Sequence, residues 1–298
     1  MCNPVTLTRH GNCGLITLFS PPVNALSQAV RSGLVAALDA ALEDPQVAWI
    51  LLQSGGRCFS AGADIKEFGK PPQSPVLPEV IDAIERSPKP VVAWLHGVSL
   101  GGGLELAMAC HYRLAAPDAR FGLPEVKLGL IPGAGGTQRL PRLIGLEAAL
   151  EMILSGEPIG TRQACELRLV DDVADQGHTP EAARLAMAAE LAGQGVRPTR
   201  ERELVATGEA PLAWLAAQRE ALALPASGDL APLKAVEALE AAMTHPFDKA
   251  LARERELFLE CLASPQRQAK VEAFLARGRD SRSLNAGGGG DTTRGTTA

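Results

Sequence analysis

The chain is poor in aromatic residues and has no cluster of basic ones. Of its 298 residues only 4% are Phe, Trp or Tyr, and 29 Lys and Arg stand against 34 Asp and Glu. Nucleic acids are bound through basic surfaces, and single strands also stack their bases on aromatic rings. We therefore expect no nucleic-acid partner.

Long apolar runs and paired cysteines are also missing. No stretch reaches the roughly 18 apolar residues that suggest a membrane span, and residues 1–14 contain no apolar signal segment. The six cysteines are scattered without a C-x-x-C pair or a neighbouring His cluster, so neither a zinc site nor a disulfide framework is indicated. The final tripeptide is not a peroxisomal address. We expect a cytoplasmic protein with no membrane segment and no metal.

Glycine-rich loops between apolar segments could in principle cradle the phosphates of a nucleotide. However, the sequence has neither the G-x-x-x-x-G-K-[ST] motif nor the dinucleotide fingerprint G-x-G-x-x-G. The five histidines likewise form no H-E-x-x-H motif, and structural roles are the simpler reading for them. These absences disfavour nucleotide binding.

The first half of the sequence shows strand and helix patterns in alternation. Residues 5–10 and 15–20 alternate apolar and polar side chains around a Gly-Asn turn, which predicts a β-hairpin. Apolar runs at 47–54 and 91–98 predict buried strands, each followed by a loop of small residues. This alternation is typical of an α/β fold.

From about residue 180 only helical patterns remain. We predict an α/β catalytic core over residues 1–195, a helical C-terminal region over 196–280 and a disordered tail over 281–298. The polar, Arg-rich stretch 197–203 reads as a solvated segment at the boundary.

Two of the loops are built alike, with small residues directly after a predicted strand. They are SAGAD at 60–64 and LGGG at 100–103, and the second also opens a helix. Small residues let a ligand approach the backbone, and the free N–H groups of a helix start favour negative charge. If the loops converge, they supply two N–H donors to one oxygen, which is the arrangement of an oxyanion hole.

Two acidic residues occur in apolar surroundings near these loops. Glu105 lies in the first turn of the glycine-opened helix, and Glu125 follows a proline in FGLPEVKLG. Either one alone reads most simply as a cap or helix-face residue. If they share a site, desolvation and mutual repulsion raise the pKa of at least one carboxyl, which suits proton transfer near neutrality. The loop IPGAGG adds a third backbone donor at Gly133.

These motifs together resemble a known family. PPVNAL, FSAGADIKEF, VSLGGGLELAMAC and FGLPEVKLGLIPGAGGTQRLP are similar to segments of the enoyl-CoA hydratase/isomerase (crotonase) superfamily. The helical segment 245–274 further resembles the end of the hydratase part of multifunctional β-oxidation enzymes, where a 3-hydroxyacyl-CoA dehydrogenase part normally follows. The resemblance implies a crotonase-like spiral of repeated β-β-α units with a C-terminal helical region. It also implies a homotrimer, a hexamer or, as in multifunctional relatives, a monomer.

The resemblance also assigns roles by position. The N–H groups of Ala63 and Gly102 would bind the thioester oxygen, Glu105 and Glu125 would hold and activate one water, and the Gly133 N–H would help to place it. Further positions match those that line the CoA and substrate pocket: Val23, Ala25, Ala61, Asp64, Ile65, Gly101 and Pro124. Arg277 is a candidate contact for a CoA phosphate.

The function that this resemblance implies is hydration of trans-2-enoyl-CoA to 3-hydroxyacyl-CoA in fatty-acid β-oxidation or related acyl-CoA catabolism. Coenzyme A would enter as part of the substrate, no cofactor would be needed, and a separate 3-hydroxyacyl-CoA dehydrogenase is a candidate partner. Alternatives are a Δ3-Δ2-enoyl-CoA isomerase, another crotonase-type acyl-CoA enzyme, and a non-catalytic acyl-CoA-binding module. Two acidic residues favour an enzyme, because a binding module needs neither.

Overall fold

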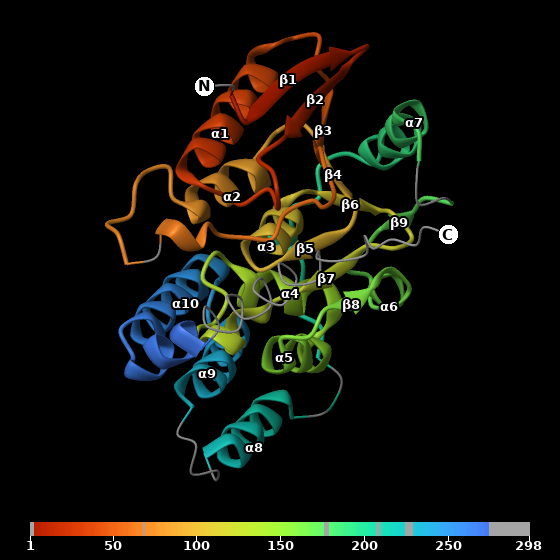
Figure 1. The fold of residues 1–298 in the computed structure, drawn as a ribbon. Coiled ribbons are helices and arrows are strands. Elements are labelled where there is room, and N and C mark those ends of the chain that lie inside the picture. Colours follow the sequence, from red (N-terminus) through yellow and green to blue (C-terminus); the bar gives the residue numbers. More distant parts are fainter. Residues whose placement is uncertain are drawn as a thin grey trace, which may run out of the picture.

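Two β-sheets frame the N-terminal part of the protein (Figure 1). The computed structural model describes residues 3–67, 69–175, 179–206, 208, 210–223 and 229–273. The larger sheet has the order β1-β2-β3-β4-β6-β9, with strands Val5–His10, Cys13–Leu18, Trp49–Ser54, Val91–Leu95, Tyr112–Ala115 and Asp172–Val173. The smaller sheet has the order β5-β7-β8, with strands Val98–Leu100, Arg120–Gly122 and Ile159–Gly160.

The predicted hairpin is confirmed. Strands β1 and β2 pair antiparallel, with His10 opposite Cys13, and Gly11 turns the chain with a φ of 62°. The second strand begins two residues earlier than the sequence pattern suggested. The remaining neighbours in the large sheet are parallel, which requires helical crossovers between them.

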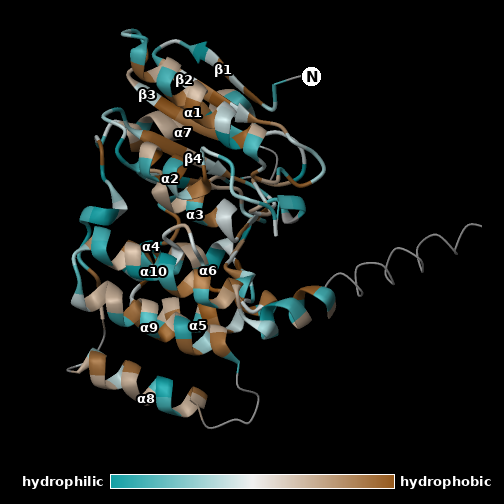
Figure 2. Ribbon diagram, turned by 90° about the vertical axis from the view of Figure 1, so that its left-hand side faces the viewer, coloured by the Kyte–Doolittle hydropathy of each residue, from teal (hydrophilic) through white to brown (hydrophobic). Residues whose placement is uncertain are grey.

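Helices cover both faces of the large sheet. Helices α1 (Gln28–Glu43), α2 (Leu77–Glu85) and α3 (Gly102–Ala109) share the main core with one face. Helix α7 (Glu181–Ala192) packs on β3, β4 and β6 and closes a second core around Trp49, Trp94 and Tyr112. Because both faces are covered, the central strands are hydrophobic along most of their length (Figure 2).

The sequence pattern was wrong about the strand at 91–98. The structure divides it into β4 and β5, which belong to different sheets. Gly97 makes the turn between them with a φ of 58°, and a Cβ there would lie 2.2 Å from the carbonyl oxygen of Arg57. Only glycine allows the chain to turn so close to that backbone, and the turn sends β5 toward the glycine run.

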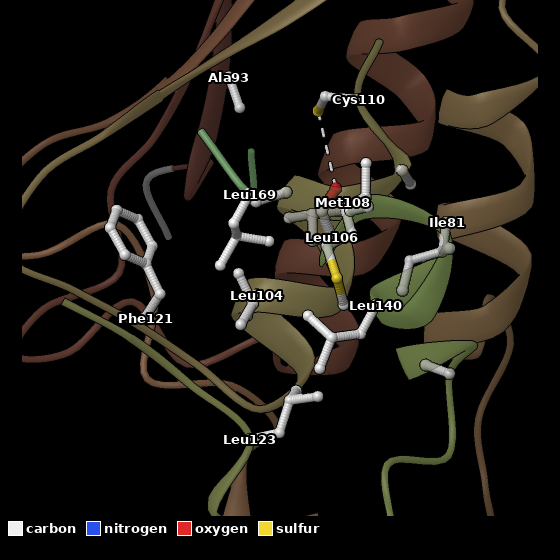
Figure 3. Close-up of a cluster of buried hydrophobic side chains, with 14 of the residues drawn as sticks. Ile81, Ala93, Leu104, Leu106, Met108, Cys110, Phe121, Leu123, Leu140 and Leu169 are labelled. Carbon is white, nitrogen blue, oxygen red and sulfur yellow. Dashed lines mark hydrogen bonds between the residues drawn. The ribbon is translucent and has the colours of Figure 1, made fainter. Parts of the chain in front are cut away.

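Helix α3 is buried on all sides. Its Leu104, Leu106 and Met108 side chains lie among residues from α2, β4, β7 and α4 (Figure 3). The Cys110 thiol at its C-terminal end donates a 3.6 Å hydrogen bond to the carbonyl oxygen of Leu106. Packing therefore fixes the position of the helix start, where the glycines lie.

The rest of the described chain is mostly helical. Bounds of the remaining α-helices are Gly136–Ile144 (α4), Leu146–Ser155 (α5), Thr161–Glu166 (α6), Pro211–Ala223 (α8), Leu230–Thr244 (α9) and Phe247–Leu262 (α10). Short 3₁₀ turns occur at Ile65–Glu67 (η1), Pro124–Leu128 (η2) and Thr199–Glu201 (η3), and residues 265–273 are also helical. Helices α9 and α10 pack directly against α4 (Figure 1). Within the described ranges, no helix is both long and apolar enough to cross a bilayer.

The Arg-rich stretch 197–203 is not a solvated boundary as the sequence suggested. Thr199 is fully buried and donates through Oγ1 to the carbonyl oxygen of Met108. Arg200 forms ion pairs with Asp82 of α2 and Asp248 of α10. These ion pairs join the α/β part to α10. The number of polar residues in the sequence cannot reveal such partners.

A buried ion pair joins α2 to α4. The guanidinium of Arg139 donates to Glu85 from Nε at 3.1 Å and from Nη2 at 2.6 Å. Both side chains are at most 1% exposed, and Arg139 also donates to the carbonyl oxygen of Ala134. The pair thereby holds the loop before α4 in place.

Replacing Glu85 by Ala should destabilise the protein by about 3–5 kcal/mol, because it leaves the Arg139 charge buried without a counter-ion. Denaturant unfolding would measure the loss. The matched control is Glu166→Ala, which removes an exposed ion pair with Arg162 and should cost about 1 kcal/mol or less. Equal losses in the two variants would contradict the proposed importance of the buried pair.

Candidate active site

The sequence left open whether the two loops of small residues converge, and in the structure they meet. Ser60 joins β5 in a parallel bridge, donating its N–H to Val98 and accepting one from Leu100. A Cβ built on Gly62 would lie 3.1 Å from the Gly102 nitrogen, and one built on Gly102 would lie 3.5 Å from the Ala63 nitrogen. The absence of side chains is what allows this approach.

The backbone N–H groups of Ala63 and Gly102 lie close together at this junction. Gly102 is the first residue of α3, so its N–H has no acceptor within the helix. Among the described residues, no hydrogen bond from either N–H group to a protein acceptor is found. Two adjacent donors at a helix start can receive a developing oxyanion.

The loop PPVNAL borders the same junction. Asn24 is buried with a φ of 52°, and its Nδ2 donates 2.8 Å hydrogen bonds to the carbonyl oxygens of Gly55 and Cys58. Ala61 donates its N–H to Val23, and Leu26 donates to Gly62. Asn24 therefore fastens this loop to residues 55–58, and the backbone bonds fasten it to the SAGAD loop at 60–64.

The residues predicted to contact CoA lie around this junction. Val23, Ala25, Ala61 and Asp64 are partly exposed, and Ala63 is exposed. Ile65 begins η1, but its side chain and the whole of Arg277 lie outside the described part of the chain. Their contacts with CoA stay predictions.

Glu125 lies against the LGGG loop at residues 100–103. Pro124 starts η2 and places Glu125 in its first turn. A Cβ on Gly101 would lie 2.9 Å from Glu125 Oε1, and Gly101 itself has a φ of 52°. Gly101 is thus required both for the turn and for the space that the carboxylate fills. The Oε2 atom of Glu125 is buried, with no hydrogen-bond partner among the described residues.

Glu105 is held more tightly than Glu125. Its side chain is buried, and its Oε1 accepts the N–H groups of Ala134 and Gly136, each at 2.8 Å. The loop before α4 thus binds the carboxylate itself. Gly133 lies in the same loop with its Cα facing the ring of Phe258, and its predicted role in placing water stays a prediction.

Burial raises the pKa of both carboxyl groups, and the charge of Glu105 adds to the rise at Glu125. Burial raises the pKa of Glu105, while the N–H groups of Ala134 and Gly136 and the charge of Arg139 oppose the rise. The pKa of Glu125 is raised well above its usual value, first by burial and then by the charge of Glu105. Both residues contact Gly101, since the Glu105 N–H donates to its carbonyl oxygen and Glu125 Oε1 fills the space beside its Cα. The two carboxyl groups therefore lie close enough to repel each other, a condition that the sequence left open.

Glu254 of α10 is a further buried carboxylate beside the site, and the sequence analysis missed it. Its Oε1 accepts the Gly135 N–H at 2.6 Å, and its Oε2 accepts the Thr137 N–H at 2.9 Å and the Thr137 hydroxyl at 2.5 Å. In the sequence it stands in the charged run RERE and reads as a surface position. No local signal distinguishes it from its neighbours.

The geometry defines a class of enzyme. Paired N–H donors stabilise an enolate oxygen, and carboxylates beside them can move protons at the adjacent carbons. Residues 8–203 match the family model described as enoyl-CoA hydratase/isomerase, and the chain belongs to that family.

Similar proteins and solved structures agree with this family assignment. The peroxisomal bifunctional enzyme of Danio rerio is 44% identical over 269 residues, covering 88% of this chain and 36% of the relative. A probable enoyl-CoA hydratase of Bacillus subtilis is 47% identical over 64% of this chain and 76% of its own length. The crystal structure of carnitinyl-CoA hydratase from Mycobacterium avium matches at 30% identity with a TM-score of 0.68, covering 93% of this chain and 97% of that one. The predicted crotonase-like fold is confirmed. This chain spans about a third of the length of the bifunctional relatives.

Replacing Gly102 by Ala should lower turnover by roughly 10²–10³-fold, because the methyl group would stand 3.5 Å from the Ala63 nitrogen, where the oxygen must bind. The fold should tolerate the change, since the nearest atom is the end of the Leu77 side chain. Initial rates and thermal unfolding would be measured together. Gly160→Ala is the control, because a Cβ there meets nothing within 4 Å. Unchanged turnover in a folded Gly102→Ala protein would place the oxyanion site elsewhere.

Proposed function

We propose that the protein hydrates trans-2-enoyl-CoA to 3-hydroxyacyl-CoA in fatty-acid β-oxidation or related acyl-CoA catabolism. The observation that carries the proposal is the placement of Glu105 and Glu125 beside the paired N–H groups of Ala63 and Gly102. Family membership and relatives named as enoyl-CoA hydratases support the same reaction.

The oxyanion site acts on the thioester. As water adds to Cβ, negative charge moves onto the thioester oxygen, which the N–H groups of Ala63 and Gly102 receive. Hydrogen bonds to this oxygen are stronger in the transition state than in the substrate, so they accelerate the reaction rather than only tightening binding.

The two carboxyl groups differ in a way that suits separate roles. Glu105 has two N–H donors on one oxygen, which favour its ionised form, and it takes a proton from the attacking water. Glu125 has an unpartnered Oε2 and the more strongly raised pKa, so the proton is favoured on Glu125 over Glu105, and Glu125 can give it to Cα. In dehydration the roles reverse.

One observation favours a second activity. Moving a double bond from position 3 to position 2 needs a single carboxyl that carries a proton between two carbons. Glu125, with its unpartnered oxygen, has the properties of such a group. Enoyl-CoA isomerisation is therefore the alternative function.

Several aspects of the biology stay predictions. The bifunctional relatives are named as peroxisomal and are longer than this chain, and a separate 3-hydroxyacyl-CoA dehydrogenase remains our candidate partner. Assembly as a monomer, trimer or hexamer and a cytoplasmic location also rest on the sequence alone.

The proposed function predicts hydration without added metal or nicotinamide, since carboxyl and backbone groups are sufficient for it. Loss of the enoyl absorbance of a short 2-enoyl-CoA would be followed in EDTA-treated protein. A requirement for a metal ion, or no hydration of 2-enoyl-CoA of any chain length, would refute the proposal.

The roles of the two glutamates can be separated by substitution. Glu105→Gln should lower hydration by roughly 10²–10⁴-fold while sparing part of any isomerase activity, and Glu125→Gln should lower both. Rates would be measured with 2-enoyl-CoA and 3-enoyl-CoA. A Glu125→Gln protein that isomerises as fast as the wild type would reverse the assignment.

A further inference from the structure

The loop that holds Glu105 is itself held by the C-terminal helix. Four successive N–H groups alternate between two carboxylates: those of Ala134 and Gly136 donate to Glu105, and those of Gly135 and Thr137 donate to Glu254. Because the donors alternate along the chain, a movement of either carboxylate would also shift the N–H groups that bind the other one.

Glu254 is more than a cap for α4. Its side chain is only 1% exposed, and it lines the same small cavity as Gly133 and Ala134. When ionised, Glu254 also raises the pKa of Glu125, so its charge reaches one of the two active-site carboxyl groups. A cap would stabilise a helix, whereas Glu254 also lies within electrostatic reach of the reacting groups.

We propose that Glu254 is a positioning residue of the active site, supplied by the C-terminal helical region to fix the loop that orients Glu105. This inference rests on the proposed hydratase activity. It assigns α10 a part in the reaction, beyond covering the catalytic core.

Charged groups from α2, α3, α4, η2 and α10 surround Glu254. On the α9 side, Lys234 and Glu237 form ion pairs with Glu260 and Arg253 of α10. Glu105 of α3 repels it, and Glu125 of η2 is affected by it in turn. The other charged groups around the cavity are Asp82 from α2, Arg139 from α4, with its partner Glu85, and Arg255 from α10. Burial and then the charge of Glu105 raise the pKa of Glu254 to about 8, although Gly135 and Thr137 donate to it.

Kinetics of Glu254→Ala and Glu254→Gln test the positioning role. Glu254→Ala should lower kcat by about 10–10²-fold with KM little changed, because Glu105 loses its fixed geometry while the CoA contacts remain. Glu254→Gln keeps the side-chain volume but places an NH₂ group against an N–H donor. Its kcat should therefore fall by a smaller factor than that of Glu254→Ala. Glu256→Gln, an exposed position on the same helix, is the matched control and should match the wild type.

The pH dependence of kcat/KM distinguishes the two roles, because it would not change if Glu254 were purely structural. The Glu254 anion, present above about pH 8, raises the pKa of Glu125 and keeps that acid protonated to higher pH. Removing the charge lowers the pKa of Glu125, so the alkaline fall of kcat/KM in Glu254→Gln should move to lower pH, by on the order of one unit. Glu256→Gln should leave the profile in place.

A milder variant covers the case in which changes at Glu254 impair folding. Thr137→Val removes the hydroxyl that donates to Glu254 and leaves the N–H groups, so it should reduce kcat by a smaller factor, while Thr137→Ser should not. Hydration by the wild type tests the proposed function independently of any variant. The positioning role would be overturned if the folded Glu254 variants, or a folded Thr137→Val protein, kept the wild-type kcat and the wild-type pH profile.

Discussion

The first turn of α4 is the constraint on which the rest of the site depends. Buried carboxylates must have hydrogen-bond donors, and a helix start has N–H groups that must have acceptors. Glu105 and Glu254 meet both requirements at one place, from helices that are far apart in the sequence. The arrangement leaves no room for a side chain at Gly136, since a Cβ there would lie 2.8 Å from Glu105 Oε1.

Other parts of the structure hold this turn from outside. Arg139 reaches back to the carbonyl oxygen of Ala134 while its pair with Glu85 anchors it to α2. Phe258 lies against Gly133 from the same helix that carries Glu254. On the opposite side, the packing of α3 fixes Glu105 relative to the oxyanion donor at Gly102. The carboxyl pair and the oxyanion site are therefore positioned by the same packed unit.

The sequence predicted those parts of the site that are encoded locally. A glycine run at a helix start, an acidic residue one turn later and a second acid after a proline are each visible within a few residues. The sequence therefore singled out Glu105, Glu125 and the two small-residue loops, but it left open whether they come together. Glu254 was not, because a run of alternating charges on a helix looks solvated until the packing of that helix is known. The same limit applies to Arg200, whose partners lie on α2 and α10, and to Gly97, where a turn interrupts an apparently continuous strand.

Three carboxyl groups in one buried site also explain how an acid and a base can coexist at a single pH. In surroundings of low dielectric, like charges close together cannot all ionise, so the protons distribute according to the hydrogen bonds that each group receives. Glu105 receives two N–H donors and gains further from Arg139, whereas the Oε2 of Glu125 has no partner among the described residues. The negative charge is therefore favoured on Glu105 and the proton on Glu125. Because Glu254 adds a charge whose donors come from the turn that holds Glu105, the backbone of that turn sets both the geometry and the protonation of the site.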